Sequence, residues 1–306
     1  MRRNALALTA ILITLALLAS GTQAASKLRV VTTIPDLKSL TEAVGGDLVE
    51  VDSLTRGTQN FHEAEVRPSM MLKLRRADVL IENGAELDAW ADVAVTGANN
   101  PGIIRGAAGR IDISRGIPLL EVPTTKVDRS MGDVHPLGNP HFSLDPGLAP
   151  PITQNIVDGL ARLAPDSRAS FEANRREFLK KLDTEMQRWT KLMEPMRGAK
   201  VVVYHPDFIY LLTRFGLVQL GTLEDRPGIP PSPQHLVQII RQMKAESVKV
   251  ILVEPWNDLK LAERVAAEVP GARALVMATA VGAVKGADNY IAAIDYNITA
   301  LAQALK

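Results

Sequence analysis

Residues 166–196 read DSRASFEANRREFLKKLDTEMQRWTKLMEPM, and this polar stretch decides the organisation of the chain. Its large apolar side chains lie near one face of a helix: Phe171, Phe178, Leu182, Met186 and Leu192. No helix breaker interrupts its interior, and Gly198 follows it. At about 1.5 Å per residue, a helix of this length spans roughly 45 Å. We therefore predict one long rigid helix, assigned to residues 166–198, that links two other parts of the chain.

Short β-rich runs alternate with helical patterns on both sides of this helix. Before it, we expect strands at 28–33, 48–54, 77–82 and 119–122, and helices at 36–44, 69–76, 86–95 and 151–164. After it, we expect strands at 201–204, 218–222, 248–253 and 274–277, and helices at 207–215, 232–245, 259–268 and 289–305. This alternation is typical of βαβ units around a mainly parallel sheet.

The predicted fold class is therefore α/β, with two lobes that each contain a mainly parallel sheet flanked by helices. We assign residues 25–165 to the N-terminal lobe and residues 199–306 to the C-terminal lobe. In open α/β sheets, the loops at the carboxyl ends of the strands line the ligand crevice. A ligand site is therefore expected in the cleft between the lobes.

Residues 1–24 have the pattern of a cleavable secretory signal peptide. Arg2 and Arg3 precede an apolar run over residues 5–19, and small residues precede a cut after Ala24. The apolar run is short for a membrane span. No cysteine stands near the cut, so a lipid anchor on an N-terminal cysteine is not expected. We predict a soluble protein of the periplasm.

The composition excludes several kinds of site. Lys plus Arg number 35 and Asp plus Glu number 34, and without a basic block nucleic acid is not an expected partner. The absence of cysteine excludes disulfides, thiolate metal ligands and a cysteine nucleophile. A functional site must therefore use His, Asp, Glu, Ser or backbone groups.

Three of the five histidines stand in loops next to predicted strand ends: His62, His141 and His205. A single histidine is most often a surface or hydrogen-bonded residue, but three in strand-end loops of a two-lobed chain suggest a shared site. Imidazole suits zinc and other late first-row metals, and three nitrogen ligands leave a fourth position for a carboxylate or water. His135, in a loop rich in Gly and Pro, and His235, in a predicted helix, are not expected to be ligands.

Several motifs occur in order along residues 28–305. They are VVTTIPDL (30–37), Gly57 followed by His62, RPS (67–69), ADVLIENG (77–84), ELDAW (86–90), NPHFSLDP (139–146), VVYH (202–205), YL (210–211) and FGL (215–217). Together they resemble the metal-binding periplasmic solute-binding proteins of ABC importers, the zinc- and manganese-receptor family.

This resemblance implies two α/β lobes bridged by one long helix, with His62, His141 and His205 as the metal ligands. It also implies a monomer whose partners are a divalent metal ion and the membrane permease of an ABC transporter. Manganese receptors of the family tend to carry a carboxylate at the third position, so His205 favours Zn(II) as the transported ligand. Oxygen ligands suit manganese, whereas imidazole suits zinc.

The sequence departs from the family pattern at the fourth ligand. The family often carries an aspartate after its last C-terminal strand, but residues 278–282 (ATAVG) contain no carboxylate. Glu254, at the end of the strand 248–253, is the first candidate, and Glu63, Glu65 or water are alternatives. Glu254 can also be a carboxylate that orients a ligating histidine. Many zinc receptors of the family carry a loop rich in His and acidic residues, and residues 124–139 do not have this composition. His135, the one histidine of this segment, could assist metal capture transiently.

The sequence leaves three other functions to consider. A manganese or iron receptor of the same family is the first. A zinc-dependent hydrolase with Glu63 as general base is the second, but no His-Glu-x-x-His and no Gly-x-Ser-x-Gly motif occurs. A receptor for a metal chelate is the third, and the low aromatic content of 4% disfavours it. We therefore predict a zinc receptor that is not an enzyme, supplied with metal from solution or by a periplasmic metallochaperone.

Overall fold

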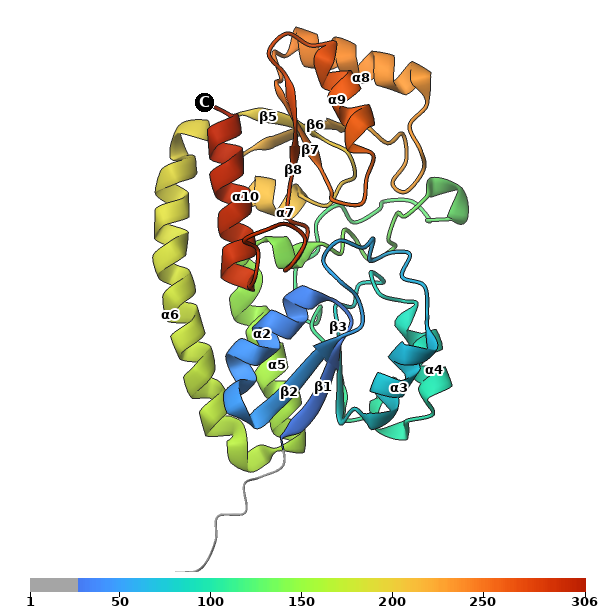
Figure 1. Cartoon of the computed structure of the whole chain (residues 1–306), viewed down its shortest axis with the longest axis vertical. Helices are drawn as coiled ribbons and strands as arrows, with labels where there is room; N and C mark the ends of the chain where they lie inside the picture. The colour runs from blue at the N-terminus through green and yellow to red at the C-terminus, as the bar shows by residue number, and fades with distance from the viewer. Residues whose placement is uncertain (1–26) are drawn as a thin grey trace, which may run out of the picture.

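The computed structural model describes residues 27–306 and shows two four-stranded parallel sheets (Figure 1). The first has the order β2-β1-β3-β4, with β1 (Leu28–Thr32), β2 (Val49–Ser53), β3 (Val79–Glu82) and β4 (Arg110–Asp112). The second has the order β6-β5-β7-β8, with β5 (Lys200–Val203), β6 (Val218–Thr222), β7 (Val250–Val253) and β8 (Arg273–Val276). The predicted fold class is confirmed. The predicted signal peptide, residues 1–24, lies outside the described residues.

Alternate side chains of the first sheet face two helical layers. Val30 packs in one core with α2 (Pro35–Gly45) and α5 (Ala149–Leu163), whereas Val31 packs in another with α3 (Pro68–Arg76) and α4 (Ala91–Ala98). Successive residues of a strand point to opposite faces, so helices cover both faces of this sheet. We call this unit the first lobe.

The second sheet follows the same rule. Val201 and Val203 face the side of α7 (Ile209–Arg214) and α10 (Tyr290–Ala304). Val202 faces the side of α8 (Pro233–Ala245) and α9 (Leu259–Ala267). We call this unit the second lobe. Within residues 27–306, none of the helices combines the length and apolar character that crossing a membrane requires.

The long helix α6 (Arg168–Met193) runs along both lobes (Figure 1). It packs against α5 and α2 of the first lobe and against α10 of the second. Phe171 near its start and Trp189 near its end are fully buried in one continuous apolar cluster. Because this cluster extends through both lobes, the helix acts as a strut that resists large hinge motion. It is shorter than predicted, since 3₁₀ turns at Pro165–Ser167 and Glu194–Met196 flank it.

Three predicted elements of the first lobe differ in the structure. Residues 119–122 form a loop, because Glu121 has a φ of 51°, a left-handed conformation that no strand accepts. The fourth strand is instead the charged segment Arg110–Asp112. The helix predicted at 86–95 begins only at Ala91, since Glu86 is also left-handed, with a φ of 68°. The helix predicted at 69–76 is α3, and it begins one residue earlier at Pro68, which suits the fixed φ of proline.

Candidate metal centre

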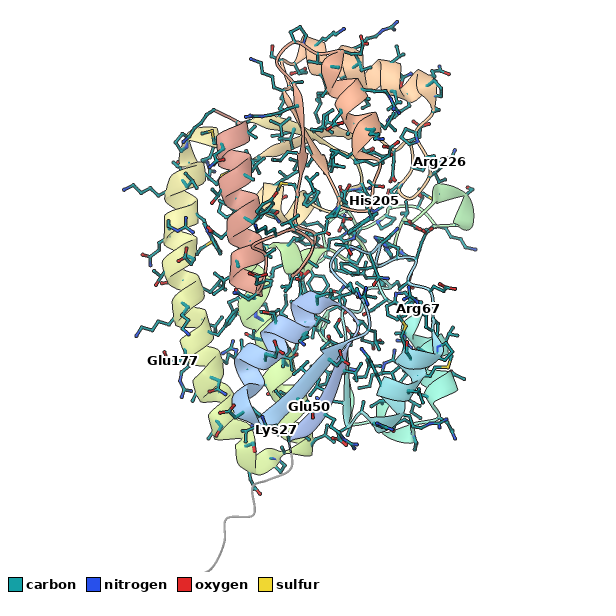
Figure 2. All side chains as sticks on the ribbon, in the orientation of Figure 1. Lys27, Glu50, Arg67, Glu177, His205 and Arg226 are labelled. Carbon is teal, nitrogen blue, oxygen red and sulfur yellow. The ribbon has the colours of Figure 1, made fainter. Side chains whose placement is uncertain are left out.

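The three histidines singled out in the sequence meet between the lobes. His62 lies in the loop that follows β2, His141 in the loop that leads to α5, and His205 directly after β5. Their ring centroids are 5.0 Å apart for His62 and His141, 5.2 Å for His62 and His205, and 6.0 Å for His141 and His205. Figure 2 shows His205 where the second lobe faces the first. Loops at the strand ends of both sheets therefore bring these three histidines together in one group.

Asp207 completes this group with a carboxylate. One ligand atom from each of His62, His141, His205 and Asp207 lies within 4.8 Å of all the others. Nε2 of His62 is 3.0 Å from Nε2 of His141, and Oδ1 of Asp207 is 2.9 Å from Nε2 of His141 and 3.5 Å from Nε2 of His205. This oxygen is buried without a hydrogen-bond partner of regular geometry. Three imidazoles and one carboxylate fit a four-coordinate zinc ion.

Asp207 was not among the ligands predicted from the sequence. The helix predicted at 207–215 begins at this residue, whereas α7 begins only at Ile209. In the structure, the backbone N–H of Asp207 donates to the carbonyl of His205 at 2.9 Å, and this tight turn brings both side chains into the group. The sequence feature that could have identified Asp207 is its spacing from His205, since the two stand as His-x-Asp in one strand-end loop.

The carboxylates proposed from the sequence as a fourth ligand lie elsewhere. Glu254 is buried, but its Oε1 accepts the backbone N–H of His205 at 3.3 Å and its Oε2 accepts the amide of Asn257 at 2.9 Å. Glu63 and Glu65 are exposed, and Glu65 lies 4.0 Å from Arg67. None of the three belongs to the grouped ligand atoms, and Glu254 instead supports the backbone of His205.

The Nδ1 atom of each grouped histidine has a partner on the side away from the centre. His141 donates to Oδ1 of Asn139 at 2.9 Å, and His205 donates to Oε2 of Glu224 at 2.7 Å. Nδ1 of His62 lies 3.1 Å from Nε2 of His135, and the two rings stack with centroids 5.0 Å apart. A partner at one ring nitrogen fixes which nitrogen faces a metal. All three rings therefore present Nε2 to the centre.

The remaining histidine is separate from the group. Nδ1 of His235 lies 2.9 Å from a carboxylate oxygen of Asp225, and its Nε2 lies 2.9 Å from the carbonyl of Thr222. It stands in α8, as the sequence predicted, and its contacts hold the start of that helix against the end of β6.

Burial and charge set the protonation of the metal-free group. Burial, with the charges of His141 and His205 next, lowers the pKa of His62 well below its ordinary value. Burial also lowers the pKa of His205, but the carboxylates around it outweigh this and raise it to about 9. For Asp207, the histidines outweigh burial and hold its pKa well below the usual range. Before metal binds, His205 is thus a cation beside the anion Asp207.

Burial dominates at His135 and Glu254. It lowers the pKa of His135 to about 4, so this imidazole is neutral at neutral pH. Burial and the charge of Asp207 raise the pKa of Glu254 well above its ordinary value.

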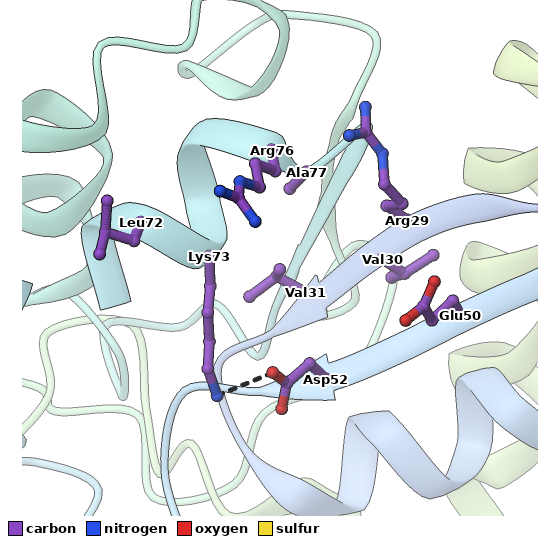
Figure 3. Close-up of a pocket in the computed structure, with 9 residues that line it drawn as sticks. All are labelled: Arg29, Val30, Val31, Glu50, Asp52, Leu72, Lys73, Arg76 and Ala77. Atoms are coloured by element: carbon purple, nitrogen blue, oxygen red, sulfur yellow. Dashed lines mark ion pairs between the residues drawn. The ribbon is translucent and has the colours of Figure 1, made fainter. Parts of the chain in front are cut away.

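A cavity of about 260 Å³ opens beside the group and is lined by both lobes, His141 and His205 included. A different pocket, of about 510 Å³, lies on the first lobe between α3 and the strands β1 and β2 (Figure 3). Three of its lining charges are in ion pairs, Lys73 with Asp52 at 2.8 Å and Arg29 with Asp78 at 2.7 Å. The imidazoles and the carboxylate of Asp207 therefore set the cavity between the lobes apart as the candidate functional site.

The chain has two parallel-sheet lobes that a long helix links, with a cluster of histidines between them. This combination is typical of a solute-binding protein with a metal-binding site. The chain matches the family described as zinc-uptake complex component A, periplasmic, over residues 30–304. The chain belongs to this family.

Several similar proteins have zinc in their names. The chain is 26% identical to the high-affinity zinc uptake system protein ZnuA of Bacillus subtilis, over 91% of this chain and 88% of that protein. It is 24% identical to the zinc-binding lipoprotein AdcA of Streptococcus pneumoniae R6, over 92% of this chain and 56% of that longer protein.

Solved structures share the fold. A crystal structure of ZnuA superposes with a TM-score of 0.78 at 26% identity, covering 92% of this chain and 100% of that chain. A manganese-bound periplasmic metal-binding protein of Candidatus Liberibacter asiaticus superposes with a TM-score of 0.76 at 22% identity, again over 92% and 100% of the two chains. This second likeness concerns the fold.

Proposed function

We propose that this protein is a periplasmic receptor that binds Zn(II) through His62, His141, His205 and Asp207 and delivers it to the permease of an ABC importer. The observation that carries the proposal is the convergence of three imidazoles and one carboxylate, with ligand atoms all within 4.8 Å of one another. Buried clusters of titratable groups with strongly shifted pKa values are typical of functional sites. The family and the zinc-related names of its members support the same function.

The donor set favours zinc over manganese. Three nitrogen ligands and one oxygen suit a tetrahedral zinc ion, whereas manganese prefers more oxygen ligands and a higher coordination number. A manganese receptor is the second candidate, because a manganese-bound protein shares this fold. The histidine at position 205 is the residue that favours zinc.

The same geometry favours a receptor over a zinc hydrolase. A catalytic zinc site keeps one coordination position open for water or substrate. Here Asp207 occupies the place of a fourth ligand, and Glu63, the base considered for such an enzyme, is exposed. His141 and His205 retain only 7% and 4% of their accessible surface, so these ligands are largely shielded from solvent.

Metal binding joins the lobes. His62 and His141 come from loops of the first lobe, and His205 and Asp207 come from one loop of the second. An ion bound by all four residues adds a bond network across the cleft and therefore favours the state in which these loops are together. Since α6 and the shared core resist hinge motion, we infer that release to the permease occurs through movement of the loops.

The proposal also covers the export, the oligomeric state and the metal source of the protein. Residues 1–24 are proposed to direct export and to be removed, without a lipid anchor, and the mature protein is proposed to act as a monomer. The family description places its members in the periplasm, which supports this location. A periplasmic metallochaperone is proposed as one source of the ion, beside free zinc.

The test is metal binding by the purified mature chain. We expect one tightly held zinc per chain, with manganese bound at least about a hundredfold more weakly, by elemental analysis and competition with a chelator. His205→Ala should weaken zinc binding by about a hundredfold or more, while His235→Ala, a histidine outside the group, should leave it unchanged. Equal zinc affinity in His205→Ala and the native chain contradicts the proposed site, and a clear preference for manganese establishes the second candidate.

A further inference from the structure

The partner of His62 differs in kind from those of the other two histidines. Asn139 and Glu224 supply oxygen atoms, which accept the Nδ1–H of His141 and His205 without ambiguity. His62 instead faces a nitrogen, Nε2 of His135, at 3.1 Å. The hydrogen bond forms only if one ring donates and the other accepts. The tautomer of His62 is thus coupled to that of a second histidine.

We propose that His135 is a positioning residue for zinc, whose Nε2 accepts the Nδ1–H of His62 so that Nε2 of His62 faces the ion. The inference rests on the zinc-binding function proposed above and extends it to a residue that is not in the ligand group. His135 itself contributes no atom to the four grouped ligand atoms.

The chemistry requires this direction of donation once metal binds. A metal on Nε2 of His62 occupies the lone pair of that nitrogen, so the ring proton must be on Nδ1. Nδ1–H then needs an acceptor, and the nearest is the lone pair of His135 Nε2. Without it, His62 is free to place its proton on either nitrogen and to rotate, which lowers the fraction of molecules ready to bind.

The loop that carries His135 is fastened to the second lobe. We call residues 128–138 the strap. The backbone N–H of Asp133 donates to the carbonyl of Pro227 at 2.8 Å, and Arg226 donates to the carbonyl of Ser130 at 2.6 Å. Gly132 permits the close approach, since a Cβ there would lie 2.1 Å from the carbonyl oxygen of Pro227. Figure 2 shows Arg226 beside this loop at the cleft.

Residues 224–228, which contact the strap, include Glu224, the hydrogen-bond partner of the proposed ligand His205. Oε2 of Glu224 accepts both Nδ1–H of His205 and the backbone N–H of Gly228, at 2.7 and 2.8 Å. The strap and residues 224–228 therefore orient one histidine from each lobe while they contact each other. Movement of the strap away from Pro227 would withdraw His135 from His62, which couples the presentation of a first-lobe ligand to a second-lobe contact.

The experiment compares His135→Ala with His135→Gln, whose side-chain oxygen can accept a hydrogen bond where Nε2 of the imidazole does. His235→Ala is the matched control. Removal of a partner that orients a metal ligand typically weakens binding by 10- to 100-fold. We expect His135→Ala to weaken zinc binding by about tenfold, and His135→Gln to restore most of the loss. Thermal unfolding monitored by circular dichroism verifies that both variants fold.

Cobalt(II) as a zinc substitute separates positioning from ligation. If His135 positions His62, the visible absorption of the cobalt-loaded protein keeps its four-coordinate intensity in His135→Ala. Unchanged affinity in His135→Ala, no recovery in His135→Gln, or a cobalt spectrum that shows a lost ligand each overturns the inference. These outcomes are distinct from failure of the proposed function, in which the native chain itself holds no zinc.

Discussion

Oδ1 of Asp207 lies 2.9 Å from Nε2 of His141, across the junction of the two lobes. Asp207 belongs to the loop after β5, and His141 belongs to the loop that leads to α5. Asp207 is almost fully buried, and its Oδ1 lacks a hydrogen bond of regular geometry. A buried anion in this position is stabilised by the histidines before metal binds and by the ion afterwards.

Asp207→Asn is the first prediction. The variant keeps the size of the side chain but loses the anion that opposes the ion, so zinc affinity should fall by about a hundredfold or more. Glu254→Gln, which alters a buried carboxylate outside the group, should have a smaller effect. Competition with a chromogenic chelator measures both affinities. The ligand set proposed here is wrong if Glu254→Gln is the more damaging of the two.

The sequence was sufficient to predict what depends on regular patterns. Apolar runs such as residues 250–253 become buried strands, and the polar helix with one apolar face becomes α6. Three strand-end histidines could be selected because parallel sheets gather the loops at their carboxyl ends. These features need only periodicity, residue type and topology.

What could not be predicted depends on precise backbone paths and on paired charges. The strand Arg110–Asp112 has charged ends, and the buried Arg110 pairs with both Glu82 and Asp92. Asp207 joins the group because the chain turns after β5, but the sequence of this segment has a helical pattern that does not indicate the turn. Glu254 stands at a strand end, as a ligand would, yet its carboxylate accepts the backbone N–H of His205.

Proton release is the second prediction. The pKa of His205 is raised to about 9 in the metal-free chain, so its ring carries a proton at pH 7.5 that zinc must displace. We expect about one proton released per zinc at pH 7.5, and an affinity that rises about tenfold per pH unit up to about pH 9. Calorimetry in buffers of different ionisation enthalpy counts the protons. Glu224→Gln keeps an acceptor for His205 but removes a charge, so it should release fewer protons, and equal release would contradict this account.

Stability against pH is the third prediction, and it concerns Asp36. Burial raises the pKa of this carboxyl to about 7, although Oδ1 accepts the backbone N–H of Val281 from the second lobe at 2.7 Å. A raised folded-state pKa gives stability that is present below the unfolded value of about 4 and is lost as pH rises through about 7. Asp88, with its pKa raised by burial to about 6, acts in the same direction.

Asp36→Asn should therefore flatten the decline of unfolding free energy between pH 4 and pH 8. Asn still accepts the N–H of Val281 but carries no charge to bury. At pH 8 the variant should be more stable than the native chain by up to about 4 kcal/mol, and the difference should shrink toward pH 4. Urea unfolding across this range measures it. Parallel curves for the two proteins would show that Asp36 does not titrate in this window.

Close packing at Gly57 gives the fourth prediction. This residue lies in the His62 loop of the first lobe, and a Cβ at Gly57 would lie 2.3 Å from the carbonyl oxygen of Val281 and 2.5 Å from the backbone nitrogen of Ala283. Both atoms are backbone of the second lobe, so the contact cannot be relieved by a side-chain rotation. Gly57→Ala must push the His62 loop away from the second lobe.

The variant should therefore lose stability and metal affinity together. Overpacking of this kind typically costs about 1–3 kcal/mol of unfolding free energy, and displacement of His62 by about 1 Å separates it from the other ligands. The matched control is Gly106→Ala, where a Cβ meets nothing within 4 Å and the backbone strain of a φ of 85° lowers stability far from the metal centre. Thermal unfolding and zinc titration of both variants test this, and we expect weaker zinc binding only in Gly57→Ala. Native zinc affinity in a destabilised Gly57→Ala would mean that the His62 loop reaches the ion independently of its contact with the second lobe.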